Sequence, residues 1–231
     1  MIIDWRFIVS KHIINRKWEN GFIVTFDTIF DHTEDFAKDI ILSKGDLFID
    51  CGAYCGMWSL QASKYYNNII AIEPTKKSLK SLRTNLHSNG ITNVKVVEAA
   101  VSSENSLKPF YIWPDGNMGN SLYHEPVTYT RDYGVGAKPI MIRTITIDSL
   151  KVNPTVIKLD VEGSEYDAII GAKDTISRCH PKLFVEIHQP SNQQKILDYL
   201  PEYEWKMNLR FMKPNNKTPF YQTQMIGEYT H

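Results

Sequence analysis

The chain has 231 residues, and its 42% hydrophobic and 12% aromatic content is enough to bury one sizeable core. Its 26 basic and 26 acidic side chains balance, so no overall field favours a polyanion, and we expect no nucleic-acid partner. No run approaches the ~18 uninterrupted apolar residues of a membrane helix, which predicts that the chain does not span a membrane.

Three cysteines, Cys51, Cys55 and Cys179, are too few for a disulfide framework, and they lack the second pair that a zinc site of this spacing needs. The first residues also lack the basic-then-apolar order of a signal peptide. We therefore expect a cytoplasmic protein whose thiols stay reduced.

Residues 1–45 precede the regular part of the chain. They contain strand-like runs at 5–9 and 22–26 and an amphipathic stretch at 33–42 that predicts a helix. We interpret residues 1–45 as a cap segment over a single globular domain, residues 46–231.

From residue 46 onward, short β-rich apolar runs alternate with longer amphipathic stretches, which predicts an α/β fold on a parallel sheet. The predicted strands are residues 46–51, 68–73, 93–98, 154–160 and 181–188. The predicted helices are residues 56–66, 75–87 and 166–172. After residue 191 we expect one more helix and two strands, residues 203–210 and 218–228.

Residues 111–140 interrupt this alternation with a long stretch that contains four glycines and several aromatic side chains. A loop this long inside a compact domain is usually functional or disordered. Its aromatic content favours a mobile lid over the substrate, formed by residues 114–140, over a disordered segment.

The clearest chemistry lies in the turn after the first strand of the domain, with the sequence Asp-Cys-Gly-Ala-Tyr-Cys-Gly at residues 50–56. Glycines in such a turn let the backbone approach a ligand, and the following helix offers its free N–H groups to an anionic part of that ligand. Glu73 ends the next strand, before Pro74, where a carboxylate can accept hydrogen bonds from two ribose hydroxyls. The alternative is a tight turn with an incidental glutamate.

The glycine spacing distinguishes between nucleotides. A dinucleotide pyrophosphate site has the pattern G-x-G-x-x-G, whereas here three residues separate Gly52 from Gly56. Asp50, two residues ahead of Gly52, would repel a pyrophosphate but suits the cationic aminocarboxylate end of S-adenosylmethionine (SAM). The pattern therefore disfavours a nicotinamide-dependent dehydrogenase and favours SAM.

Four segments together resemble the FkbM family of SAM-dependent methyltransferases, namely residues 48–56, 71–74, 157–165 and 183–188. The Lys-Leu-Asp-Val-Glu-Gly run in the third segment is the most specific part of a similarity that covers about residues 46–190. The resemblance implies a class I methyltransferase (Rossmann-like) fold, with a mostly parallel seven-stranded sheet and helices on both faces. It also implies acceptors that are typically hydroxyls of sugars or natural products. The family's usual Asn-Ile-Gly in the first loop is replaced by Tyr-Cys-Gly in this chain.

The resemblance also implies residues that bind the cofactor. The first loop and the acid of the second strand are expected to hold SAM, and the adenine is expected near the end of the third strand. There Ala100 offers a small wall, although core packing explains that residue equally well. The implied cofactor-binding residues are Asp50, Gly52, Ala53, Tyr54, Gly56, Glu73, Pro74, Glu98, Ala99, Ala100 and Asp160.

Asp160 and His188 end the fourth and fifth predicted strands, where open α/β sheets bind ligands. One interpretation makes Asp160, or His188 with an ordinary imidazole pKa of ~6.5, the general base for an acceptor hydroxyl, with Glu162 beside them. Another is a divalent metal site of Asp160, Glu186 and His188, since a buried charge such as Glu186 needs a partner or ligand. The plain alternative is that Asp160 and Glu162 cap the next helix and His188 is an ordinary loop residue.

These features predict a SAM-dependent methyltransferase, in the first place an O-methyltransferase that acts on a hydroxyl of a sugar or another small molecule. Nitrogen is a second acceptor type. A non-catalytic nucleotide-binding or scaffold protein of the same fold is the alternative, although the presence of Asp50, Glu73 and Asp160 together argues against it.

Overall fold

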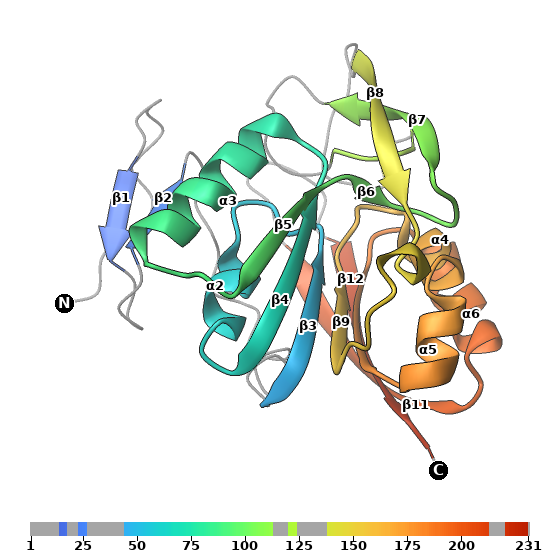
Figure 1. The fold of residues 1–231 in the computed structure, drawn as a ribbon. Coiled ribbons are helices and arrows are strands. Elements are labelled where there is room, and N and C mark those ends of the chain that lie inside the picture. The colour runs from blue at the N-terminus through green and yellow to red at the C-terminus, as the bar shows by residue number, and fades with distance from the viewer. Residues whose placement is uncertain are drawn as a thin grey trace.

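The computed structural model describes residues 14–17, 23–26, 44–112, 120–123, 138–212 and 220–230. Seven strands form one central sheet in the order β11-β12-β10-β9-β3-β4-β5 (Figure 1). In chain order they are β3 (Gly45–Cys51), β4 (Tyr66–Glu73), β5 (Val94–Glu98), β9 (Val156–Leu159), β10 (Lys182–Ile187), β11 (Tyr203–Met212) and β12 (Phe220–Tyr229). Each of the strands predicted for the domain is confirmed, and the fold class with them.

The sheet is mostly parallel, as expected. β5, β4, β3, β9 and β10 pair in parallel, whereas β12 runs antiparallel to its neighbours β10 and β11. The chain builds outward from β3 in one direction through β4 and β5, and then continues on the other side of β3 with β9. Such a switch point, at the carboxyl ends of the strands, is where open α/β sheets bind ligands.

Helices cover both faces of the sheet. α2 (Met57–Ala62) and α3 (Lys76–Ser88) lie on one face, and α4 (Glu165–Ile170), α5 (Lys173–Cys179) and α6 (Pro190–Tyr199) lie on the other (Figure 1). The alternation along β3 places Phe48 in a buried cluster with Trp58 of α2 and places Ile49 in a cluster with Ile169 of α4. Among the described helices, none is long and apolar enough to cross a membrane.

The structure also contains a second sheet, of three strands, that was not predicted from the sequence. Its order is β6 (Ala100–Val101), β8 (Lys138–Ile145) and β7 (Ser106–Ile112). β7 and β8 overlap the two ends of the stretch predicted as one loop, at residues 111–112 and 138–140. Pro109 argues against a strand, but β7 lies at the edge of this sheet, where a missing N–H donor is tolerated.

The helices differ from prediction in two places. α2 ends at Ala62, several residues before the predicted end. Two short elements, α5 and the 3-10 helix η1 (Asp148–Leu150), were not predicted, because so few turns carry no recognisable periodic pattern.

Ahead of residue 44 the structure describes an antiparallel pair of strands, β1 (Ile14–Lys17) and β2 (Ile23–Phe26), and β2 lies against α3 (Figure 1). The strand predicted over residues 22–26 is confirmed, whereas β1 was not predicted. The predicted strand over 5–9, the predicted helix over 33–42 and most of the predicted lid lie outside the described residues. The division into a cap and one domain stays a prediction.

Candidate active site

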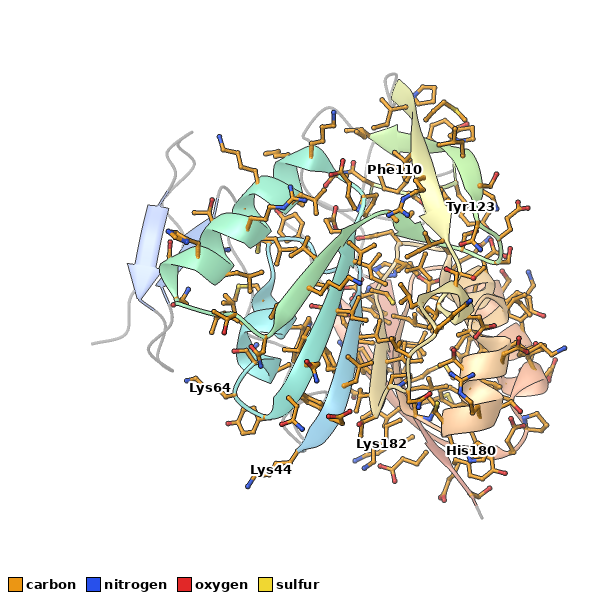
Figure 2. All side chains as sticks on the ribbon, viewed as in Figure 1. Lys44, Lys64, Phe110, Tyr123, His180 and Lys182 are labelled. Atoms are coloured by element: carbon orange, nitrogen blue, oxygen red, sulfur yellow. The ribbon has the colours of Figure 1, made fainter. Side chains whose placement is uncertain are left out.

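The predicted site residues gather where the parallel strands end. β3, β4, β9 and β10 direct their carboxyl ends to the same edge of the sheet, called here the carboxyl edge (Figure 1). In Figure 2, Phe110 and Tyr123 lie toward this edge, whereas Lys44, Lys64 and Lys182 lie at the opposite one. The labelled lysines are therefore remote from the candidate site.

The glycine-rich loop leads from β3 to α2 across the carboxyl edge. Gly52 and Gly56 have positive φ angles of 73° and 90°, and Tyr54 between them has a φ of 51°. A β-carbon on Gly52 would overlap the carbonyl oxygen of Asp160. Only glycine therefore lets the loop lie this close to the end of β9.

Because of this contact, we expect Gly52→Ala to destabilise the fold as well as to lower the affinity for a ligand. Gly90→Ala is the matched control, since Gly90 also has a positive φ, 64°, but nothing lies within 4 Å of an added β-carbon there. The control should lose about 1 kcal/mol of stability, and Gly52→Ala about 1–3 kcal/mol more. Thermal unfolding measures both, and equal losses would show that crowding against Asp160 is unimportant.

Asp50 lies beneath the loop, fully buried near the end of β3. Its carboxylate accepts a hydrogen bond from Ser59 Oγ at 2.6 Å and pairs with Lys158 Nζ at 3.1 Å. Lys158, with a side chain only 2% exposed, also donates to the carbonyl oxygen of Gly52 at 3.0 Å and pairs with Asp160 Oδ2 at 3.4 Å. Asp50 therefore supports the loop through Lys158 and Ser59, and its carboxylate has no exposed surface to offer a ligand.

Glu73, at the end of β4, joins the glycine-rich loop to the turn before α3. Its Oε2 accepts the N–H of Tyr54 at 3.0 Å, and its Oε1 accepts the N–H and the hydroxyl of Thr75 at 2.9 and 2.6 Å. Burial raises the pKa of the Glu73 carboxyl above its usual value, and these hydrogen bonds oppose that rise. Ala53 is buried inside the loop, and Pro74 is half-buried after Glu73.

The residues predicted to face the adenine lie at the end of β5 and just after it. Glu98 is exposed, and its side chain pairs with Arg83 at 3.8 Å. Ala99 belongs to the main buried core, and Ala100 packs with Phe110 of β7. The described contacts of both alanines are core packing, so a contact with adenine stays a prediction.

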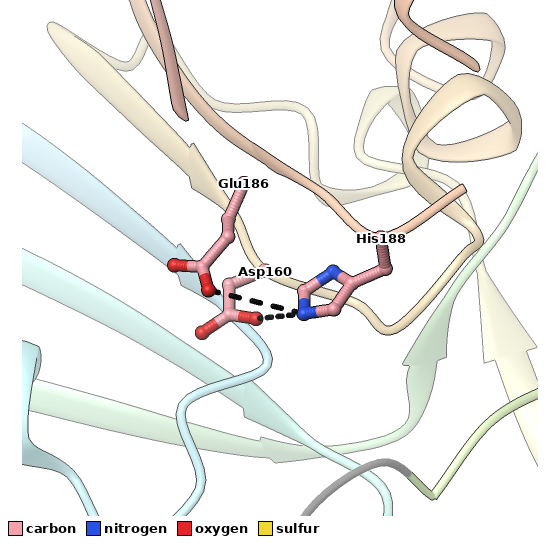
Figure 3. Close-up of side chains that lie close together, drawn as sticks. All are labelled: Asp160, Glu186 and His188. Atoms are coloured by element: carbon pink, nitrogen blue, oxygen red, sulfur yellow. Dashed lines mark ion pairs between the residues drawn. The ribbon is translucent and has the colours of Figure 1, made fainter. Parts of the chain in front are cut away.

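A second group of side chains meets at the ends of β9 and β10. His188 follows β10, and its side chain is 4% exposed. Its Nε2 lies 3.5 Å from Glu162 Oε2, 3.7 Å from Asp160 Oδ1 and 3.9 Å from Glu186 Oε1, and Figure 3 shows the last two carboxylates beside the imidazole. The structure therefore brings together every residue considered for catalysis or for a metal in the sequence analysis.

Glu165 holds the other side of the imidazole. It begins α4 and is fully buried, and its Oε1 lies 2.9 Å from His188 Nδ1. The same carboxylate accepts hydrogen bonds from the Gly163 N–H and from the side-chain amide of Asn192, each at 2.7 Å. Glu165 thus fixes the ring so that Nε2 faces the carboxylates of Asp160, Glu162 and Glu186, which we name the carboxylate cluster.

The surrounding charge corrects the expected titration of His188. Burial lowers the pKa of its imidazole, but the carboxylates of Glu162, Glu165 and Asp160 outweigh burial and raise that pKa well above 6.5. The expectation of an ordinary imidazole pKa is therefore wrong. The surrounding carboxylates therefore favour the protonated, cationic form of the imidazole.

Residues 120–123 belong to the predicted lid and lie on the turn between β9 and α4. Ser121 Oγ donates to the carbonyl oxygen of Glu162 at 2.6 Å, and the Tyr123 hydroxyl donates to Asp167 Oδ2 at 2.7 Å. This part of the predicted lid therefore contacts the turn that carries Glu162, while its mobility stays a prediction.

Several members of these networks were not predicted from the sequence, namely Ser59, Lys158, Glu165 and Asn192. A signal existed for Lys158, because it interrupts an apolar strand and a charge buried there needs a partner. Glu165 and Asn192 carry no such signal, because polar residues are ordinary in amphipathic helices.

Comparison with known proteins agrees with this geometry. The model of the methyltransferase FkbM domain matches residues 50–208, more than half of the chain. This protein belongs to the FkbM methyltransferase family. The resemblance stated from four sequence segments is thereby confirmed.

Similar structures have the same fold as this FkbM protein. A methyltransferase FkbM from Methylobacillus flagellatus KT gives a TM-score of 0.53 at 22% identity, over 80% of this chain and 44% of that one. A protein of Streptococcus mutans in complex with S-adenosylhomocysteine (SAH) gives a TM-score of 0.50 at 12% identity, over 86% of this chain and 99% of that one. At these identities the likeness shows the fold, which is the class I methyltransferase fold that we expected.

Curated relatives are longer than this chain. A tRNA/tmRNA (uracil-C(5))-methyltransferase of Aliivibrio salmonicida is 25% identical over 180 residues, which are 68% of this chain and 48% of the relative. A protein of the same name from Cronobacter sakazakii is 30% identical over 95 residues, 40% of this chain and 25% of the relative. The chain thus spans at most about half the length of these relatives.

Proposed function

We propose that this protein is a SAM-dependent methyltransferase that methylates a hydroxyl oxygen of a sugar or another small molecule. The observation that carries the proposal is the contact between Gly52 and the backbone of Asp160 at the switch point of the sheet. This contact puts the glycine-rich loop and the carboxylate cluster side by side at the carboxyl edge. Methyl transfer needs a cofactor site and an acceptor site that adjoin, because the methyl carbon and the acceptor oxygen must be held in line.

The residues present fit SAM at Glu73 and the glycine-rich loop. A carboxylate offers about four acceptor positions, and Glu73 uses three of them in its bonds to Tyr54 and Thr75. One position is left for a ribose hydroxyl, so binding both hydroxyls requires one of these bonds to exchange. SAM, when bound, supplies an electrophilic methyl group on a positively charged sulfur. Asp50 acts from below the loop, through Lys158.

The carboxylate cluster is the part of the site that suits the acceptor. The side chains of Asp160 and Glu162 are 26% and 20% exposed, so both are reachable from the carboxyl edge. A carboxylate within hydrogen-bond reach of the acceptor hydroxyl can take its proton as the oxygen is methylated. Asp160 also lies directly against Gly52, which makes it the link between the two halves of the site.

The names of the curated relatives make RNA the competing acceptor. Two observations favour a small hydroxyl acceptor. Methylation of a ring carbon calls for a side-chain nucleophile. Cys51 and Cys55 are buried, and burial raises the pKa of the Cys51 thiol, which disfavours its nucleophilic thiolate form. Cys179 lies at the end of α5, before β10 begins, and so at the opposite end of that strand from the carboxyl edge. The balance of basic and acidic residues also provides no excess positive charge for a polyanion.

Calorimetry and a transfer assay test the proposal. Titration with SAH, the demethylated cofactor, should show one molecule bound per chain, and titration with NAD should show none. An assay with a labelled methyl group then compares pools of carbohydrates, other small alcohols, amines and RNA. Label in a hydroxyl pool supports O-methylation, and label in RNA alone refutes it. SAH binding without transfer to any pool would favour a non-catalytic binding protein.

Glu73→Gln should weaken SAH binding at least tenfold, because a neutral amide loses charge-assisted hydrogen bonds worth ~1.5–3 kcal/mol. Glu104→Gln is the control, since Glu104 is an exposed carboxylate that pairs with Lys108 beside the small sheet. Its SAH affinity should equal that of the parent protein. Circular dichroism establishes that both variants fold, and a folded Glu73→Gln variant with unchanged affinity would remove Glu73 from the ribose site.

A further inference from the structure

We propose that Asp160, Glu186 and His188 form a binding site for one divalent cation at the carboxyl edge. The binding of the cation stands on the geometry of these residues alone. Its use in the reaction rests on the proposed function.

The distances between the donor atoms suit an ion. Asp160, Glu186 and His188 each contribute one donor atom, and these atoms lie within 4.8 Å of one another. Figure 3 shows the three side chains pointing toward one another. Two ligands of one cation, each about 2.0–2.4 Å from it, can be at most about 4.8 Å apart. The separations of His188 Nε2 from the two carboxylates, 3.7 and 3.9 Å, meet this limit and exceed the ~2.8 Å of a direct charge-assisted hydrogen bond.

The imidazole is directed into this space by a group outside it. Glu165 binds His188 Nδ1 at 2.9 Å and is itself held by the Gly163 N–H and by Asn192. A carboxylate on the far ring nitrogen is the arrangement that orients histidines bound to metals. Nε2 is therefore a buried nitrogen, on a side chain 4% exposed, that faces three carboxylates at 3.5–3.9 Å.

Negative charge also exceeds positive charge around this space. Four carboxylates surround one imidazole, those of Asp160, Glu162, Glu165 and Glu186. The nearby ammonium of Lys158 pairs with Asp160 at 3.4 Å, but it also neutralises the buried Asp50 at 3.1 Å. Holding several carboxylates together away from water is costly unless cations join them. A divalent cation between Nε2 and the carboxylate cluster would supply that charge where the donor atoms converge.

The donor set indicates the kind of ion and its use. One imidazole nitrogen with carboxylate oxygens suits a first-row divalent ion such as Mn²⁺, since Mg²⁺ prefers oxygen ligands alone. The exposed sides of Asp160 and Glu162 leave room for further ligands. A hydroxyl of the acceptor that ligates such an ion has a lowered pKa. The site therefore selects acceptors whose oxygen can ligate a cation.

The site is tested by titrating the metal-free protein with Mn²⁺. The electron paramagnetic resonance signal of the free ion measures binding, because that signal is lost when the ion binds. We expect one Mn²⁺ per chain. His188→Gln should weaken binding about tenfold or more, whereas His87→Gln, at an exposed position on α3, should leave it unchanged. Spin-echo spectra of the unmodified protein should show a directly bonded histidine nitrogen, which tests the proposal even if His188→Gln does not fold.

Absence of saturable Mn²⁺ binding, or bound Mn²⁺ without a nitrogen ligand, would overturn the proposal. Calorimetry with SAH on the same metal-free sample separates this result from the proposed function. Binding of SAH without binding of Mn²⁺ overturns the cation site alone. Binding of Mn²⁺ without binding of SAH supports the cation site and overturns the proposed function.

Discussion

Replacing Lys158 by methionine should lower the free energy of unfolding by about 3–5 kcal/mol. Methionine keeps most of the apolar stem but removes the ammonium that pairs with Asp50 at 3.1 Å. Asp50 is fully buried, so its carboxylate would keep the Ser59 hydrogen bond but lose its cation away from water. Urea unfolding followed by circular dichroism measures the change.

Lys182→Met is the matched control for this variant. Lys182 in β10 pairs with Glu228 at 3.0 Å, almost the same separation, but the two side chains are 43% and 56% exposed. An exposed pair contributes ~0–1 kcal/mol, so the difference between the variants measures the effect of burial. Adding Asp50→Asn to Lys158→Met should recover part of the loss, because it removes the unpaired charge. Equal losses at Lys158 and Lys182 would contradict a special role for the buried pair.

The central sheet was predictable because its strands are short apolar runs between turn residues, a pattern that needs no knowledge of the partners. The small sheet was not predictable in that way. Leu107 of β7 and Met141 of β8 are 65% and 62% exposed, so apolar residues lie on both sides of these strands and the alternation is lost. Pairing between β7 and β8, distant in sequence, is what makes them strands.

The candidate site was predictable in its membership but not in its electrostatics. Asp160 and His188 meet because they follow parallel neighbouring strands, which the order of elements already indicates. Asp50 shares its side of β3 with Phe48, and α2 covers that side, so strand alternation explains why it supports the loop from below. The pKa of His188 is raised by Glu162, Glu165 and Asp160. The contribution of Glu165 was not predictable, because Glu165 reaches the ring through the packing of α4 against β10, which no local pattern encodes.

Glu165→Ala should lower the free energy of unfolding by about 3–5 kcal/mol in the absence of any metal ion. The change leaves the Gly163 N–H, the Asn192 amide and His188 Nδ1 without the acceptor that they share in the interior. Each buried donor left without an acceptor favours the unfolded state by about 1–3 kcal/mol, and three donors lose their acceptor here. Urea unfolding in the presence of a chelator measures this loss separately from any effect of a cation.

Asp167→Ala, in the same helix, is the control, because the Asp167 carboxylate binds the Tyr123 hydroxyl at an exposed position and should contribute ~1 kcal/mol or less. Glu165→Gln separates shape from charge, since its amide keeps one acceptor oxygen while the imidazole loses its anionic partner. We expect it to be more stable than Glu165→Ala and yet to bind Mn²⁺ about 10–100-fold more weakly than the parent, because the imidazole loses the anionic partner that raises its basicity as a ligand. A loss of stability in Glu165→Ala no larger than in Asp167→Ala would mean that His188 is held by something other than Glu165, and the argument that Nε2 is fixed toward Asp160 and Glu186 would fail with it.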